Sequence, residues 1–298
     1  MRVGIGPPTF HGNLVDGPGL LEWARLADAA GFHSLAVHDK PNSDTWEPLA
    51  VLAALAPVTR RVRLATTAVL LPTRDEALVA KQALVVDRVS GGRLDLGVSV
   101  GARADDFELF GREMAGRGRR FEAQLARILD LWTTATVTSE SGAGMGPAPV
   151  QQPHPRLWVG GYADAAVGRA VRYGSGYIFG APGPVVMASR IPVIREAAAA
   201  AGRDPFPIAG LAYVLPTDDA AEIAHGESLL RRYYGTLHKP FDEMVMIGTG
   251  GRLADAVRRY ETAGVDVLHL LPVTTSPAAI DRLATDVLPA FESSGERS

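Results

Sequence analysis

The most constraining feature of this sequence is an eightfold alternation of short apolar runs with longer amphipathic segments. Each short run has the length and β-branched composition of a buried strand. The expected strands are Arg2 to Gly6, His33 to His38, Val62 to Leu70, Arg93 to Val100, Arg156 to Gly160, Gly176 to Gly180, Ile208 to Leu215 and Val265 to Leu271. An open doubly wound sheet usually has fewer strands, so eight units in 298 residues favour a closed parallel (β/α)8 barrel.

The segments between the strands have helical periodicity. Apolar residues recur three and four positions apart in both of the clearest examples, which gives each segment one apolar face. The first has Leu20, Trp23, Ala24 and Ala27, and the second has Phe121, Leu125, Ile128 and Trp132. No composition shift separates these units, so we expect residues 1–298 to form a single barrel domain.

Two segments do not follow the alternation. Residues Thr136 to Gln152, "TVTSESGAGMGPAPVQQ", are rich in Gly and Pro and follow the fourth strand and its helix. We expect an inserted loop or hairpin there, and a lid that excludes water is one possible role. The second segment, Tyr234 to Met244, has neither helical nor strand periodicity.

Composition excludes several classes of function. The 30 basic and 33 acidic residues are interspersed and give a net charge of −3, so there is no basic stripe for a nucleic-acid backbone. The absence of cysteine excludes disulfides, thiolate metal sites and a cysteine nucleophile. No segment approaches the roughly 20 apolar residues of a membrane span. Pro7 and Pro8 interrupt the N-terminus too early for a signal peptide, so we expect a cytoplasmic protein without membrane or nucleic-acid partners.

The carboxyl ends of the strands, where such barrels place their active sites, have few catalytic side chains. His38 and Asp39 are adjacent and point to opposite faces of a strand, which argues against a metal centre. Lys40 already lies in a loop, where a Schiff-base lysine is not expected. Ser99 in "GVSVG" runs along a strand instead of sitting on a nucleophile elbow.

Glycines remain at these strand ends. In "WVGGYADAAVGRAVRYG", Gly160 and Gly161 stand where a strand meets a helix. Backbone N–H groups at such a junction can bind a phosphate, although a tight turn explains the same pair. Small residues also recur in "GGRLDLGVSVGARADDFELFG", residues 91 to 111, which predicts that something other than protein lies against this strand end.

Four segments together resemble the bacterial luciferase-like monooxygenase family of flavin- or deazaflavin-dependent oxidoreductases. They are "VSGGRLDLGVSVGARADDFELFG", "RGRRFEAQLARILDLW", "LWVGG" and "AGVDVLHLLP", which occur in the family's order and cover almost the whole chain. The resemblance implies a barrel of the luciferase-like type that binds reduced FMN or the deazaflavin coenzyme F420 at its mouth. It also implies a homodimer, a small organic substrate and, for a flavin, a separate flavin reductase.

The resemblance also implies site residues. Seven positions are expected to bind the cofactor: Thr67, Ala68, Ser99, Gly101, Gly160, Gly161 and Tyr162. The peptide bond between Thr67 and Ala68 is expected to be a non-prolyl cis bond. The candidates for polar contact or proton transfer are His11, His38 and Lys40, and no metal is implied. Trp46 is a candidate for the pocket wall, whereas His269 inside "VLHLLP" fits a core histidine better.

The chain departs from the family pattern at three positions. Lys40 stands where the family commonly has histidine, Ala102 replaces an acid of some deazaflavin dehydrogenases, and Val100 replaces the phosphate-binding arginine of the luciferases. Light emission and sugar-phosphate oxidation are therefore disfavoured. The expected reaction is monooxygenation with FMN or hydride transfer with the deazaflavin, the latter slightly preferred because the chain is compact and lacks the luciferase arginine. The alternative is a non-catalytic flavin-binding or degenerate barrel.

Overall fold

The computed structural model of the 298-residue chain describes residues 1–9, 16–133, 145–235, 237 and 239–291. Within these ranges, eight parallel strands form a closed barrel in the order β10-β1-β2-β3-β5-β6-β7-β8, and β8 pairs with β10 to close it. The strands are β1 (Arg2–Ile5), β2 (Ser34–Val37), β3 (Arg63–Thr66), β5 (Leu94–Ser99), β6 (Arg156–Gly160), β7 (Gly176–Ile178), β8 (Ile208–Leu215) and β10 (Val267–Pro272). The predicted (β/α)8 barrel is confirmed.

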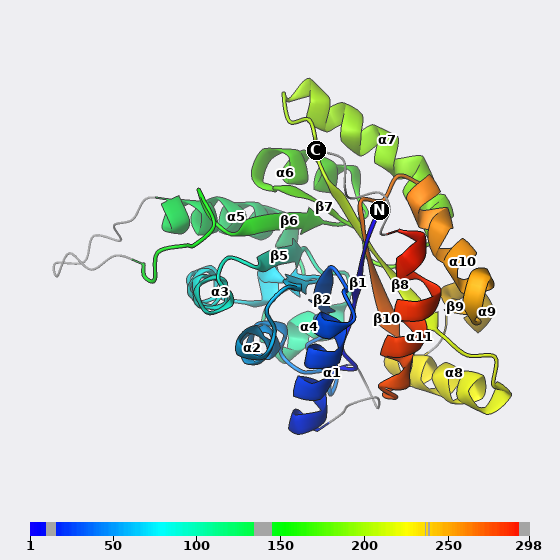
Figure 1. The fold of residues 1–298 in the computed structure, drawn as a ribbon. Coiled ribbons are helices and arrows are strands. Elements are labelled where there is room, and N and C mark those ends of the chain that lie inside the picture. The colour runs from blue at the N-terminus through cyan, green and yellow to red at the C-terminus, as the bar shows by residue number, and fades with distance from the viewer. Residues whose placement is uncertain (10–15, 134–144, 236, 238, 292–298) are drawn as a thin grey trace.

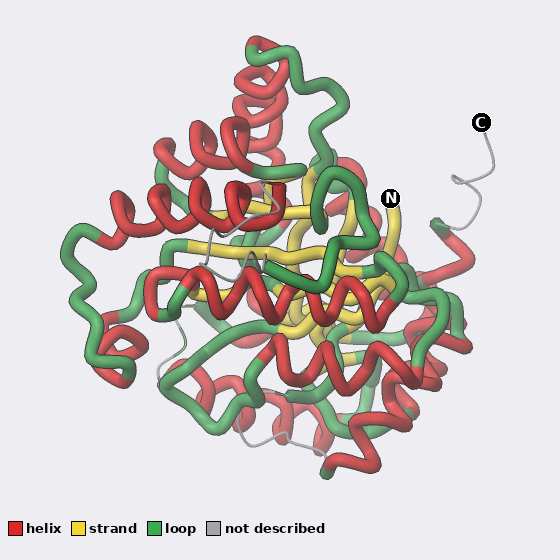
Figure 2. The backbone as a smooth tube through the Cα atoms, turned by 90° about the vertical axis from the view of Figure 1, so that its left-hand side faces the viewer, coloured by secondary structure: helices red, strands yellow, loops and turns green. Residues whose placement is uncertain are grey.

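Helices surround the strands on the outside of the barrel (Figures 1 and 2). They are α1 (Gly17–Ala29), α2 (Pro48–Leu55), α3 (Glu76–Ser90), α4 (Ala104–Leu109), α5 (Arg117–Thr133), α6 (Asp164–Tyr173), α7 (Pro184–Ala200), α8 (Ala220–Tyr234), α9 (Phe241–Met244), α10 (Gly250–Thr262) and α11 (Ala278–Asp286). The apolar faces predicted for α1 and α5 are the faces that they bury. Among the described residues, no helix combines the length and apolarity needed to cross a bilayer.

Two short strands depart from the predicted pattern. The expected strand Val62 to Leu70 is divided, because β3 ends at Thr66 and β4 (Val69–Leu70) pairs separately with β5. The Thr67–Ala68 peptide bond between them is cis, as the resemblance implied. The segment Tyr234 to Met244 contains α9 and leads into β9 (Val245–Ile247), which pairs with the carboxyl end of β8.

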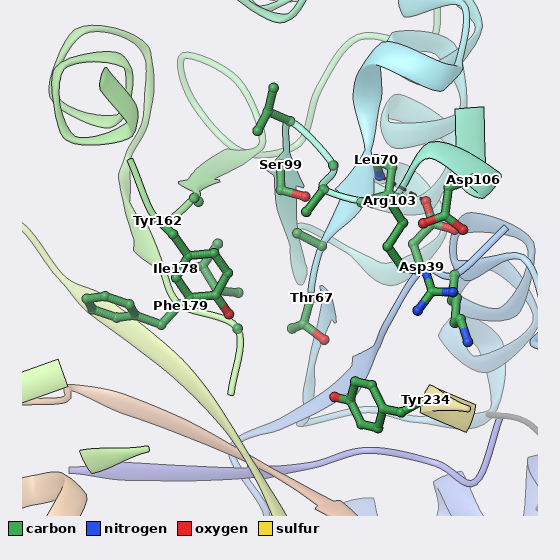
Figure 3. A pocket seen from close by; sticks show the side chains of 18 of the residues that line it. Asp39, Thr67, Leu70, Ser99, Arg103, Asp106, Tyr162, Ile178, Phe179 and Tyr234 are labelled. Carbon is green, nitrogen blue, oxygen red and sulfur yellow. Dashed lines mark hydrogen bonds between the residues drawn. The ribbon is translucent and has the colours of Figure 1, made fainter. Parts of the chain in front are cut away.

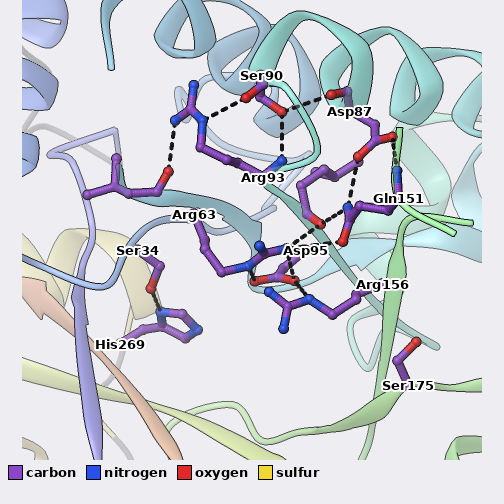
Figure 4. A network of polar contacts seen from close by, with 12 residues as sticks. Ser34, Arg63, Asp87, Ser90, Arg93, Asp95, Gln151, Arg156, Ser175 and His269 are labelled. Atoms are coloured by element: carbon purple, nitrogen blue, oxygen red, sulfur yellow. Dashed lines mark hydrogen bonds and ion pairs between the residues drawn. The ribbon is translucent and has the colours of Figure 1, made fainter. Parts of the chain in front are cut away.

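The lid interpretation of the inserted segment is wrong for its described part. Residues 134–144 lie outside the described ranges, and residues 145–150 form no strand. Gln151 Nε2 donates hydrogen bonds to Asp87 Oδ1 (2.8 Å) and to the Leu94 carbonyl (2.7 Å), at the end of α3 and the beginning of β5 (Figure 4). This part of the insertion therefore lies at the amino-terminal end of the barrel, opposite the strand ends where the site was expected.

The barrel interior is polar at its amino-terminal end. Asp95 on β5 accepts two hydrogen bonds from Arg63, 2.6 and 2.9 Å long, and lies 2.8 Å from Arg156 Nε (Figure 4). Higher up, Ser34 Oγ lies 3.1 Å from His269 Nδ1, and a Cβ at Gly4 would approach that hydroxyl to 2.1 Å. His269 is therefore the core histidine that the sequence predicted.

Burial of His269 predicts a pH-dependent stability. Burial lowers the pKa of His269 from 6.5 to about 4, so the folded protein keeps this imidazole neutral while the unfolded chain takes up a proton below pH 6.5. Lowering the pH from 7 to 5 should therefore decrease the free energy of unfolding, with about 2 kcal/mol of the decrease from this residue. Urea unfolding of wild type and His269→Gln at both pH values measures the contribution of His269 to the decrease in unfolding free energy. Identical pH dependence of the two proteins would contradict it.

Candidate active site

A cavity of about 300 Å³ opens at the carboxyl ends of the barrel strands (Figure 3). Its walls come from five strand ends and two helices. The contributing residues are Asp39 and Lys40 after β2; Thr67, Ala68 and Leu70 around β4; Ser99, Val100, Gly101 and Ala102 at β5; Gly160, Gly161 and Tyr162 at β6; Ile178, Phe179 and Gly180 at β7; Arg103 and Asp106 at α4; and Tyr233 and Tyr234 at the end of α8. This volume lies within the range of small-molecule sites.

All seven positions predicted to bind a cofactor lie in this wall. They come together because β3, β5 and β6 are consecutive neighbours in the barrel and end at the same level. Gly101 has a φ of +74°, which disfavours any side chain. A Cβ at Gly160 would lie 2.4 Å from the Ile178 carbonyl oxygen. The backbone is bare here because larger residues do not fit, and a ligand can therefore approach it closely.

Of the three residues predicted to make polar contacts or transfer protons, only Lys40 is found in the part of the cavity wall that the structure describes. Lys40 lines the cavity, its ammonium group donates to the Tyr233 carbonyl, and its Nζ lies 4.1 Å from the centre of the Tyr233 ring. Burial lowers its pKa, and the nearby Arg103 lowers it further. His38 is buried and packs edge-on against Tyr233 at 5.7 Å, but it is not part of the cavity wall. His11 lies outside the described residues.

Trp46 is not part of the cavity wall and packs, partly buried, against the hydrophobic core. The expectation that Trp46 belongs to the pocket wall is therefore wrong. Asp164 is the first residue of α6, with Ala163 at the cap position, and its carboxylate lies 2.7 Å from Arg190.

Two carboxylates that sequence reasoning did not select lie in the wall. Asp39 accepts hydrogen bonds from Arg74 Nη2 and the Leu70 amide, each 2.9 Å long, which ties the loops after β2 and β3 together. Asp106 accepts a 3.3 Å hydrogen bond from the Asn42 amide, and burial raises its pKa. The adjacent acids in "RADDF" could have indicated the first turn of α4. Only the fold shows that Asp106 belongs to the cavity wall.

Two tyrosines at the end of α8 were also missed. Tyr233 and Tyr234 lie about 130 residues from the glycine motif in the sequence, and their helix has an ordinary amphipathic pattern. The end of α8 lies at the mouth, where both tyrosines line the cavity and the Lys40 ammonium group lies against the Tyr233 ring. No local sequence signal indicated this contact.

The fold and site define a class of protein: a parallel barrel whose open end combines bare backbone with few polar groups. The chain belongs to the luciferase-like monooxygenase family, because the family model described as "Luciferase-like monooxygenase" matches residues 1–266.

Relatives of known sequence include an uncharacterised protein of Mycobacterium tuberculosis, 33% identical over 215 residues that cover 62% of this chain and 73% of that protein. The oxygenase component of the flavin-dependent trigonelline monooxygenase of Acinetobacter baylyi is 29% identical over 150 residues, which cover 47% of this chain and 42% of that protein. The second match therefore spans less than half of either chain.

Two solved structures illustrate the likeness of fold. Monooxygenase RslO1 from Streptomyces bottropensis superposes with a TM-score of 0.84 at 25% identity, covering 98% of this chain and 100% of the other. An F420-dependent secondary alcohol dehydrogenase superposes with a TM-score of 0.78 at 19% identity, with the same coverage.

Proposed function

We propose that this protein is an oxidoreductase that binds a tricyclic redox cofactor at the mouth of the barrel and acts on a small organic substrate. The single observation that carries this proposal is the bare cavity wall at the ends of β3, β5 and β6. Thr67, Ser99, Gly101 and Gly160 all face the cavity there. In addition, Thr67 Oγ1 is buried and has no hydrogen-bond partner among the described residues, which fits a ligand that supplies one.

The residues of the wall have separate roles in this proposal. Ser99, Gly101 and the Gly160–Gly161–Tyr162 turn hold the cofactor, while Thr67 and Ala68 support its ring. When bound, reduced FMN supplies electrons for reaction with oxygen, whereas the deazaflavin exchanges a hydride with an alcohol or carbonyl group. The apolar wall formed by Leu70, Ile178 and Phe179 limits the access of water.

In this proposal, Lys40 and Asp106, which also line the cavity, transfer the protons. A carbonyl that gains a hydride also needs a proton, and an alcohol that loses one must release a proton. Burial lowers the pKa of Lys40 and raises that of Asp106, and both shifts bring these groups nearer to neutral pH. Asp106 stands four residues after Ala102, the position where some family members have an acid.

Both cofactors have support from relatives. The trigonelline enzyme is a flavin-dependent oxygenase component, which favours FMN with a separate reductase. The alcohol dehydrogenase uses F420, and this chain has Val100 where the luciferases have their arginine, which favours the deazaflavin. We prefer the deazaflavin and hydride transfer.

The test uses the protein loaded with each cofactor and a panel of alcohols, ketones and aromatic compounds. Oxidised F420 with alcohols and reduced F420 with carbonyl compounds are followed by cofactor absorbance without oxygen. Reduced FMN is followed with oxygen by product mass. Turnover with either cofactor supports an enzyme, and anaerobic turnover of the deazaflavin supports our preference. Tight binding without turnover across the panel would instead favour the non-catalytic barrel.

A further inference from the structure

Aromatic side chains form part of the cavity wall. Tyr162 and Phe179 come from the ends of β6 and β7, and Tyr233 and Tyr234 come from the end of α8. Figure 3 shows Tyr234 across the cavity from Tyr162 and Phe179, with Thr67 drawn between them. Aromatic side chains therefore stand on two opposite sides of the cavity.

Three of these four rings pack against other rings. Tyr234 packs edge-on against Tyr233, with centroids 4.9 Å apart, and against Tyr213 at 6.2 Å. On the other side, Phe179 packs against Tyr177 at 4.8 Å. Rings fixed in this way lose little conformational freedom on binding and favour edge or face contacts with another ring.

Hydroxyl groups stand beside the aromatic surfaces. The hydroxyls of Tyr213 and Tyr234 lie 2.8 Å apart. Burial raises the pKa of both phenols, so both hydroxyls keep their protons at neutral pH. Thr67, only 7% exposed, adds a buried hydroxyl that has no hydrogen-bond partner among the described residues. Buried hydroxyls of this kind are satisfied by an oxygen atom on the ligand.

We infer that the substrate of this site is a flat aromatic compound that carries a hydroxyl or oxo group. The ring system lies between the Tyr162–Phe179 and Tyr233–Tyr234 walls, and its oxygen contacts the hydroxyls of Thr67 and Tyr234. Lys40 and Asp106 line the same cavity. This inference rests on the proposed function, because it assigns to the substrate the space beside the cofactor.

The test compares probes that share one carbon skeleton. 2-Naphthol is aromatic and hydroxylated, naphthalene lacks the oxygen, and decahydro-2-naphthol has the oxygen on a saturated ring system. Their dissociation constants are measured by calorimetry on protein loaded with the cofactor that binds. We expect 2-naphthol to bind about tenfold more tightly than either of the others.

Two variants identify the residue responsible. Tyr234→Leu should weaken 2-naphthol binding about tenfold and leave cofactor affinity within about twofold. Tyr234→Phe, the matched control, keeps the ring and should retain most of the preference for 2-naphthol over decahydro-2-naphthol. Equal binding of these two probes to wild type would overturn the inference. So would a Tyr234→Leu variant that loses cofactor affinity instead, since the aromatic wall would then serve the cofactor.

The experiment also distinguishes failure of this inference from failure of the proposed function. If wild type binds neither cofactor, the probes are measured on the protein alone. A preference for 2-naphthol that Tyr234→Leu abolishes would then still support an aromatic site in a protein of another function. Absence of that preference would overturn both proposals.

Discussion

Replacement of Ser99 by tryptophan is expected to reduce cofactor affinity by about 100-fold, equivalent to roughly 3 kcal/mol of binding free energy. Ser99 is the last residue of β5, where it lines the cavity and pairs with Leu70 on one side and Gly160 on the other. The cavity measures about 300 Å³, so an indole ring at this position occupies space that the cofactor ring needs. Ligand-induced shifts of the melting temperature and calorimetric titration measure the loss.

Ser99→Ala is the matched control for this prediction. It removes the hydroxyl without filling the cavity and should keep affinity within about threefold of wild type. Circular dichroism of the apo proteins checks that both variants are folded. Unchanged cofactor affinity in a folded Ser99→Trp protein would place the cofactor elsewhere.

Gly97→Ala is expected to destabilise the fold by about 3 kcal/mol. Gly97 lies within β5, and a Cβ there would approach the Thr66 carbonyl oxygen to 2.1 Å. The backbone cannot easily move away, because Thr66 Oγ1 donates to the Gly97 carbonyl (2.7 Å) and accepts from its amide (2.9 Å). Adding one methyl group therefore separates β3 from β5 directly below the site.

Chemical denaturation of Gly97→Ala and Gly168→Ala tests this reasoning. Gly168 lies inside α6, and no atom is within 4 Å of a Cβ built there. Its replacement by alanine should stabilise the protein by about 0.5 to 1 kcal/mol, because the unfolded chain loses freedom and the helix loses nothing. Equal stabilities of the two variants would show that the contact with Thr66 does not control the strand spacing.

Local patterns in the sequence were sufficient for the barrel and its strand ends, and the family resemblance implied much of the site. The alternation of strand and helix determines which residues end each strand, and parallel strands bring those ends to one face. Thr67, Ser99 and Gly160 could therefore be grouped without coordinates, and the structure brings them together.

The remaining parts of the site depend on contacts between distant segments. Tyr234 is the last residue of α8, and it lines the cavity beside strand ends that are distant in the sequence. Asp106 is an ordinary polar residue of α4 in the sequence, and it is buried because that helix packs beside Asn42. The inserted segment was expected at the wrong end of the barrel, for a reason that lies in the topology. A loop that follows a helix and precedes a strand lies at the amino-terminal end of a barrel.

The most direct test of the account is a titration of the wild-type protein with FMN and with F420, each oxidised and reduced, followed by absorbance and fluorescence. We predict saturable binding of at least one of them with one molecule per chain and a spectrum altered by transfer into a largely apolar site. If all four forms leave both the spectra and the protein unchanged, the open end of this barrel does not hold a redox ring, and the proposed function is wrong.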